Sequence, residues 1–175
     1  MTVPTDDRRP GATPGPVAWW RGHRGEWFVV VQSALMVLVA VGPRSIGGWP
    51  EWEFPAPLVT RPLGAALVLV GGAVFVLSLM RLGPSLTALP YPKADGTLEV
   101  RGPYAFVRHP IYGGAILASL GWALVVQGWL TLAYAAVLFV FLDVKASREE
   151  RWLADRYPGY REYQRRVRKL VPFVY

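Results

Sequence analysis

One long stretch of this sequence carries no charge: no Asp, Glu, Lys or Arg occurs from Pro110 through Leu142. As a single α-helix the stretch would be roughly 50 Å long, whereas the hydrocarbon core of a bilayer is only about 30 Å thick. The tripeptide Gln127-Gly128-Trp129 lies at its midpoint. The pattern therefore predicts a hairpin of two short transmembrane helices, over 111–127 and 129–144. Small residues would let the two arms of this hairpin approach closely; they are Gly114, Ala118, Gly121, Ala133 and Ala136.

Two further apolar blocks precede the hairpin, over 27–42 and 62–82, and each suits one more span. Together these blocks predict an all-α fold, an integral membrane helical bundle with about four transmembrane helices and the lipid bilayer as its first partner. Lys and Arg are concentrated in the N-terminal region, between Arg81 and His109, and at the C-terminal end. Because basic residues favour the cytoplasmic side, we expect a multi-pass protein of the cell membrane with both termini in the cytoplasm.

The two ends of the chain differ in pattern. Residues 1–20 are rich in Pro, Gly, Thr and charge, which predicts a flexible N-terminal tail, with residues 21–175 forming a single membrane domain. Residues 145–170 are charged and helical in pattern, with a break at Pro158-Gly159. After the break, aromatic and arginine residues recur at helical spacing, which predicts an amphipathic helix at the cytoplasmic headgroups.

Composition excludes several kinds of chemistry. Cysteine is absent and His23 and His109 are the two histidines, so we expect no disulfide, no cysteine nucleophile and no metal cluster. The formal net charge of +7 would favour nucleic-acid binding in a soluble protein. Here the apolar blocks favour basic residues that flank a membrane instead, so neither nucleic acid nor metal is an expected partner.

The start of the third predicted span carries the first group of residues suited to chemistry. Pro110 suits the first turn of a helix, because its missing N–H would be unpaired there in any case. The helix N-terminus, with Arg108 and His109 beside it, favours an anion such as a carboxylate. Gly113 would let a flat ligand approach the backbone. The alternative is that Arg108 and His109 anchor a helix end at the headgroups and the glycines only pack helices.

The second group lies at the other end of the hairpin, where Lys145 and Glu149 are four residues apart and share one helical face. A carboxylate at this boundary between solvent and hydrocarbon could hold ribose hydroxyls or an ammonium group. The alternative is a solvated helix with an internal ion pair, which would contribute only about 0.3–0.5 kcal/mol.

The two groups together resemble a known family. Three motifs, over Leu98–Tyr104, Arg108–Gly113 and Glu149-Glu150, are similar to those of isoprenylcysteine carboxyl methyltransferases. The similarity continues through Leu153, Tyr157, Tyr160, Tyr163, Val167 and Pro172. Phosphatidylethanolamine N-methyltransferases are similar in the proline-tyrosine-glycine and paired-glutamate elements. The resemblance extends from about Leu82 to the C-terminus.

This resemblance implies a pocket for S-adenosylmethionine, formed by the loop before the third span and the segment after the fourth. The residues implied to bind this cofactor are Tyr104, His109, Pro110, Ile111, Tyr112, Gly113, Gly96, Thr97, Leu98, Glu99 and Glu149. Lys145 lies where the family usually has an arginine that faces the acceptor. We expect the groups that act in catalysis to be Lys145, Arg108 and Glu150.

The sequence thus predicts an integral membrane methyltransferase that moves a methyl group from S-adenosylmethionine to a lipophilic or prenylated acceptor. A carboxylate acceptor, as in isoprenylcysteine-type O-methylation, needs no general base. An amine or a thiol must first be deprotonated, for which Glu149, Glu150 and Tyr104 are candidates. Two other interpretations are an NADPH-dependent membrane reductase, similar to the steroid 5-alpha-reductase group, and a non-enzymatic membrane scaffold.

Overall fold

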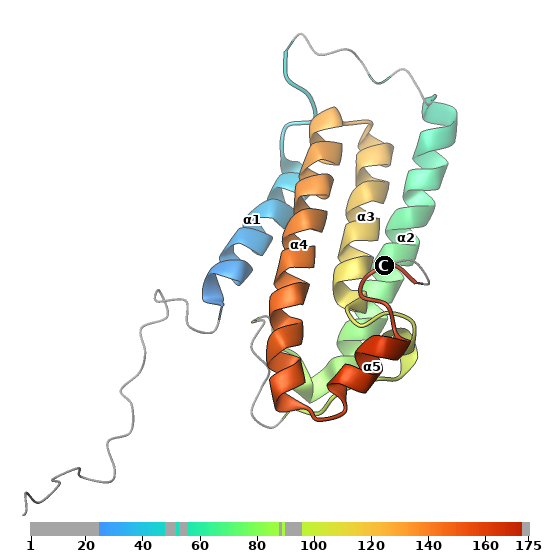
Figure 1. Ribbon diagram of the computed structural model, residues 1–175. Coiled ribbons are helices and arrows are strands. Elements are labelled where there is room, and N and C mark those ends of the chain that lie inside the picture. The colour runs from blue at the N-terminus through green and yellow to red at the C-terminus, as the bar shows by residue number, and fades with distance from the viewer. Residues whose placement is uncertain (1–24, 48–51, 53–55, 88, 90–95, 173–175) are drawn as a thin grey trace, which may run out of the picture.

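The computed structural model describes residues 25–47, 52, 56–87, 89 and 96–172. Within this part of the chain the elements are helical, apart from an isolated parallel bridge between Val107 and Arg168, which confirms the all-α class. The α-helices are α1 (Glu26–Val41), α2 (Pro57–Leu82), α3 (Pro110–Val126), α4 (Trp129–Arg156) and α5 (Tyr160–Arg166), and the 3₁₀ turns are η2 (Gly83–Ser85) and η3 (Gly102–Ala105). Helices α1 to α4 form a bundle, and the short α5 lies at its lower end (Figure 1).

The predicted helical hairpin is present as α3 and the first half of α4. Its turn contains Gln127, whose φ of 50° lies in the left-handed region, and Gly128. Helix α4 does not end near residue 144, as the predicted span did, but continues to Arg156, because Lys, Ala, Arg and Glu are strong helix formers. The predicted break at Pro158-Gly159 is confirmed and separates α4 from α5. The predicted N-terminal tail lies outside the described residues.

Two of the described helices, α2 and α4, are long and apolar enough to cross a membrane, whereas α1 and α3 are shorter apolar helices. Large apolar side chains point outward along α2, where Leu58, Leu69 and Met80 are 87%, 73% and 74% exposed. Such a continuous apolar surface is unusual in a soluble monomer and would be covered by lipid in a bilayer.

Helices α2 and α3 pack through glycines on both helices. A Cβ atom at Gly71 would lie 2.7 Å from the Gly114 carbonyl oxygen, and one at Gly64 would lie 2.5 Å from that of Gly121. The two backbones are therefore in direct contact, as small residues permit. The prediction that Gly114 and Gly121 pack within the α3–α4 hairpin is wrong, because their glycine partners belong to α2. The predicted alanine partners on α4 are exposed; they are Ala133 and Ala136.

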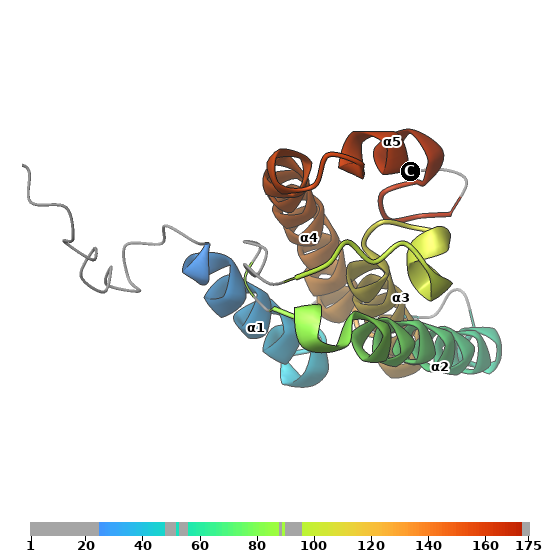
Figure 2. The same ribbon diagram turned by 90° about the horizontal axis from the view of Figure 1, so that it is seen from below.

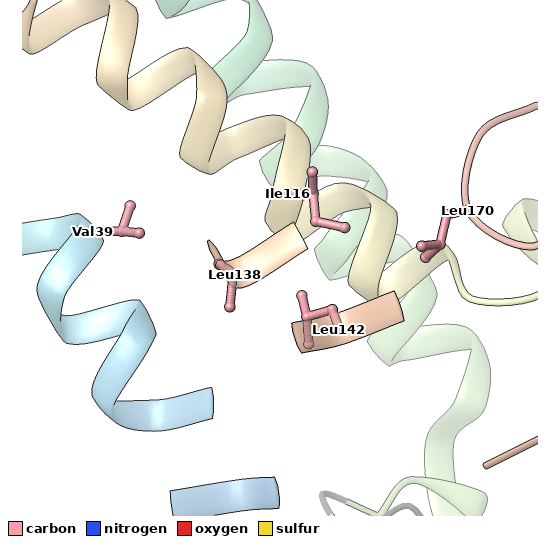
Figure 3. Packing of buried hydrophobic residues seen from close by; sticks show 5 residues of the cluster. All are labelled: Val39, Ile116, Leu138, Leu142 and Leu170. Atoms are coloured by element: carbon pink, nitrogen blue, oxygen red, sulfur yellow. The ribbon is translucent and has the colours of Figure 1, made fainter. Parts of the chain in front are cut away.

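The buried apolar core lies between α1, α3, α4 and the segment after α5. Its buried members are Val39, Ile116, Leu138, Leu142 and Leu170 (Figure 3). The segment that carries Leu170 is tied to the start of α3. The Arg108 N–H donates to the Arg168 carbonyl oxygen at 2.8 Å, and the His109 N–H donates to that of Lys169 at 3.1 Å. Seen from below, α5 and this segment lie beside the ends of α4 and α3 (Figure 2).

Candidate active site

The charged side chains before α3 are held by one carboxylate of α4. Arg108 Nε donates to Glu150 Oε1 at 2.7 Å, and His109 Nε2 lies 3.2 Å from the same oxygen. The other oxygen of Glu150 accepts from Gln164 Nε2 at 3.1 Å. Arg108 Nη1 also donates to the carbonyl oxygens of Gln164 and Val167. Because the Arg108 and Glu150 side chains are only 11% and 12% exposed, this pair forms a buried ionic link between α3, α4 and the C-terminal segment.

The neighbouring carboxylate, Glu149, has different partners. The Tyr112 hydroxyl donates to Glu149 Oε2 at 2.8 Å, and His109 Nδ1 lies 3.8 Å from the same oxygen. The rings of His109 and Tyr112 are stacked, with centroids 5.4 Å apart. The structure thus brings the group before α3 and the group at the end of the hairpin into contact.

Lys145 lies one turn before Glu149 on α4 and is 1% exposed. Its Nζ donates to Gln32 Oε1 of α1 at 2.6 Å and lies 5.1 Å from the centroid of the Tyr112 ring. Helices α1, α3 and α4 therefore meet at this ammonium group. Gln32 was not predicted as a site residue, although an amide in the middle of an apolar helix is a signal for function.

These side chains surround a cavity of about 330 Å³ at the end of the bundle where α3 begins. The predicted residues that line it are Gly96, Thr97, Leu98, Glu99, Tyr104, Arg108, His109, Ile111, Tyr112, Lys145 and Glu149. The structure places three predicted residues away from the wall. Pro110 is buried as the first residue of α3, a Cβ at Gly113 would meet the Leu170 carbonyl oxygen, and Glu150 belongs to the Arg108 network.

Part of the cavity wall comes from residues that the sequence analysis did not assign to the site. They are Gln32, Phe75, Leu79, Leu82, Ser85, Leu86, Thr87, Leu153, Tyr157, Tyr160 and Tyr163. The Tyr157 hydroxyl donates to the Gly96 carbonyl oxygen at 2.7 Å, which ties the stretch before η3 to the end of α4. The signal for Tyr160 and Tyr163 was their recurrence after the Pro158-Gly159 break, which predicted an amphipathic helix at the headgroups.

Buried tyrosine hydroxyls form one side of the cavity. The Tyr163 hydroxyl donates to the Tyr104 carbonyl oxygen at 2.5 Å, and the Tyr104 hydroxyl faces the Ser78 carbonyl oxygen at 3.5 Å. Burial raises the pKa of Tyr104 above its ordinary value, and the Glu149 carboxylate raises it further. Tyr104 is therefore a neutral hydroxyl at physiological pH and a poor general base. The Tyr160 hydroxyl is buried on the wall without a hydrogen-bond partner among the described residues.

The same part of the chain matches a known family. The model of the phospholipid methyltransferase family matches residues 59–159, which is more than half of the chain. The chain belongs to this family. The matched range includes most of α2 and all of α3 and α4, and therefore most of the cavity wall. The resemblance to isoprenylcysteine carboxyl methyltransferases is also confirmed by relatives named protein-S-isoprenylcysteine O-methyltransferase.

This member of the phospholipid methyltransferase family is similar to curated proteins with three different names. Cobalt-zinc-cadmium resistance protein CzcN of Cupriavidus metallidurans is 30% identical over 152 residues, 86% of this chain and 64% of that protein. Methanethiol S-methyltransferase 1 of Bradyrhizobium diazoefficiens is 44% identical over 71 residues, 40% of this chain and 24% of that protein. Protein-S-isoprenylcysteine O-methyltransferase of Schizosaccharomyces pombe is 30% identical over 82 residues, 46% of this chain and 35% of that protein. The chain thus spans less than two thirds of each relative's length.

Proposed function

We propose that this family member is a membrane methyltransferase that uses S-adenosylmethionine to methylate a lipophilic acceptor. The observation that carries the proposal is the convergence of His109, Tyr112 and Glu149 on one cavity, from the two ends of the α3–α4 hairpin. Relatives named for methyl transfer to a thiol or to isoprenylcysteine support the same class of reaction. Family membership also favours methyl transfer over an NADPH-dependent reductase or a scaffold.

The cavity suits S-adenosylmethionine in size and in the groups on its wall. Its volume of about 330 Å³ lies within the range of roughly 300–1,000 Å³ that is usual for ligand pockets. The Glu149 carboxylate suits ribose hydroxyls or an amino group, and the aromatic faces of Tyr104 and Tyr112 suit a flat base or a sulfonium cation. The buried Tyr160 hydroxyl provides a hydrogen-bonding group for such a ligand.

S-adenosylmethionine supplies an electrophilic methyl group on a sulfonium. The residues of the chain then contribute mainly by alignment and by excluding water. The buried pair of Arg108 and Glu150 fixes the start of α3, and Tyr157 holds the backbone at Gly96. A carboxylate acceptor is already a nucleophile at neutral pH. For a thiol or an amine, the carboxylates of the cavity wall, Glu99 and Glu149, are the available bases.

A second, apolar cavity supports a lipophilic acceptor. It has a volume of about 350 Å³, lies between α1, α2 and α3, and is lined by Met36, Val39, Ala40, Val68, Gly72, Phe75, Gly114, Ala115, Ala118, Ser119 and Trp122. Phe75 lines both cavities, so a hydrocarbon chain in the apolar cavity would bring its head group to the polar one. The acceptor that suits this arrangement is a prenylated or otherwise lipophilic carboxylate.

We also propose that helices α1 to α4 all cross the membrane, with both termini in the cytoplasm and residues 21–175 forming one membrane domain. Helices α1 and α3 have 16 and 17 residues, or about 25 Å, close to the lower limit for a span. Val37 and Val41 on α1 are 58% and 78% exposed, as expected for a lipid-facing surface. The exposed arginines of α5 suit anionic headgroups, which supports an amphipathic role for this helix.

The proposed function is tested by incubating membranes that contain the protein with methyl-labelled S-adenosylmethionine and extracting the lipids. We expect label in the extract that mild base removes, because a methyl ester is base-labile. Label that resists base would identify an N- or S-methyl product and overturn the carboxylate acceptor. Label that persists in His109→Ala and Glu149→Ala variants at the wild-type level would contradict the proposed site.

A further inference from the structure

Gln32 is an amide in an otherwise apolar part of α1. Removing such a group from water is costly unless it forms a hydrogen bond, and Gln32 forms one with Lys145 at 2.6 Å. Because an ammonium group only donates, the amide oxygen faces Lys145 and the amide nitrogen keeps its capacity to donate. Gln32 and Lys145 therefore provide N–H groups at the same point of the cavity wall.

Along α1, the polar cavity is followed by the apolar one. Gln32 lines the polar cavity, and Met36, one helical turn further along α1, lines the apolar cavity. On the other side, Lys145 lies over the Tyr112 ring, whose hydroxyl donates to Glu149. A molecule with a hydrocarbon chain in the apolar cavity would therefore place its head group near Gln32 and Lys145.

The resemblance already places Lys145 facing the acceptor. We propose that Gln32 is a positioning residue that directs the Lys145 ammonium toward the anionic group of the acceptor. This inference rests on the proposed methyltransferase function and assigns the part of the site that selects the acceptor. Ammonium and amide N–H groups suit a carboxylate, whereas the Glu149 carboxylate suits the cationic methyl donor. The two ends of this wall thus prefer opposite charges, which assigns the acceptor and the donor to different parts of the cavity.

The test is equilibrium binding of N-acetyl-S-farnesylcysteine, and of its carboxamide, to the purified full chain. The affinity for S-adenosylmethionine is measured separately. Gln32→Leu removes the hydrogen bond and keeps α1 apolar, and we expect acid binding to weaken about tenfold to a hundredfold. Carboxamide and donor binding should stay at the wild-type level. In turnover, the KM for the acid should rise by the same factor with little change in kcat.

Two further variants separate positioning from packing. Gln32→Glu keeps a hydrogen-bond acceptor for Lys145 but adds a negative charge, so acid binding should weaken at least as much as in Gln32→Leu. Ser33→Ala changes the exposed neighbouring position on α1 and should bind like the wild type.

Three results would overturn the proposal. The first is equal loss of acid and carboxamide binding in Gln32→Leu, which indicates a structural role. The second is a wild-type protein that does not prefer the acid to the carboxamide. The third is weaker donor binding in Gln32→Leu, which would assign the pair to the donor site and leave the proposed function intact. A wild type that does not bind S-adenosylmethionine would contradict the proposed function, and the preference for acid would still decide the role of Gln32.

Discussion

The α2–α3 interface and the charged network at the start of α3 hold the same helix by different means. In the interface, Gly71 and Gly114 let two backbones touch, and the contact depends on the absence of side-chain atoms. In the network, Arg108 and Glu150 form a buried ion pair, and the contact depends on both charges being present. The glycine contact leaves no room for a ligand between the two backbones, whereas Arg108 of the network lines the polar cavity. The glycine contacts thus fix the position of α3 against α2 in its apolar half, and the groups suited to chemistry lie at its polar end.

The largest effect is expected from breaking the network. Glu150→Ala leaves the Arg108 guanidinium buried without its carboxylate, which should lower the free energy of unfolding by about 3–5 kcal/mol. Glu162→Ala is the matched control, because Glu162 and Arg166 form an ion pair with side chains that are 55% and 74% exposed. This control should lose less than about 1 kcal/mol in denaturant titrations in mixed micelles. Equal losses in the two variants would show that the buried pair does not hold α3.

A second variant distinguishes the adjacent glutamates. Glu149→Gln keeps the fold but removes the charge that we assign to the methyl donor, so binding should weaken by about 1.5–3 kcal/mol, or roughly tenfold to a hundredfold. Titration calorimetry with S-adenosylmethionine measures this loss, and thermal unfolding should change little. An unchanged dissociation constant would remove Glu149 from the donor site.

The apolar interface is tested by adding one methyl group. In Gly71→Ala the new Cβ would lie 2.5 Å from the Ala118 backbone nitrogen, so the helices must separate, at a cost of about 1–3 kcal/mol. Gly72→Ala is the control, because its Cβ would have no neighbour within 4 Å among the described residues. The unfolding temperature should fall below that of the wild type in Gly71→Ala and should stay unchanged in Gly72→Ala. The same unfolding temperature in both variants would contradict close backbone packing.

The smallest effect concerns alkaline pH. Burial raises the pKa of the Tyr163 hydroxyl above its ordinary value, so the folded protein keeps a proton that the unfolded chain releases above about pH 10. The contribution of Tyr163 to the free energy of unfolding should be constant below pH 10 and should decrease as the pH rises further. Tyr163→Phe should cost about 1 kcal/mol at pH 8, through its lost hydrogen bond to the Tyr104 carbonyl, and make the alkaline decline shallower. Unfolding temperatures of the wild type and of Tyr163→Phe, measured from pH 8 upward, check this prediction. An equally steep alkaline decline in the two proteins would refute it.

Local rules explain which parts of the fold could be predicted. Proline in the first turn fixes Pro110 at the start of α3, and the length of the charge-free stretch requires a turn near Gln127-Gly128. The partner of Gly114 could not be predicted in the same way. A small residue indicates that a backbone approaches closely, but it does not indicate which helix supplies that backbone.

The candidate site shows the same limit. His109 and Glu149 could be placed near each other because a hairpin returns the chain to its starting side. Glu149 lines the cavity to which the resemblance assigned it. Adjacent helical residues point about 100° apart, so Glu150 faces Arg108 instead, and the sequence could not show this pairing. Gln32 was missed because its partner, Lys145, lies on a helix far away in the sequence.

Photochemical cross-linking of labelled S-adenosylmethionine, followed by peptide mapping, tests most directly whether one cavity unites the two ends of the hairpin. We predict label both in the peptide with Tyr104–Tyr112 and in the peptide with Glu149–Tyr163. Excess unlabelled S-adenosylmethionine should abolish the labelling, and NADPH should not. Label confined to segments that do not line the cavity, or label displaced by NADPH alone, would contradict the assignment of this cavity to the methyl donor.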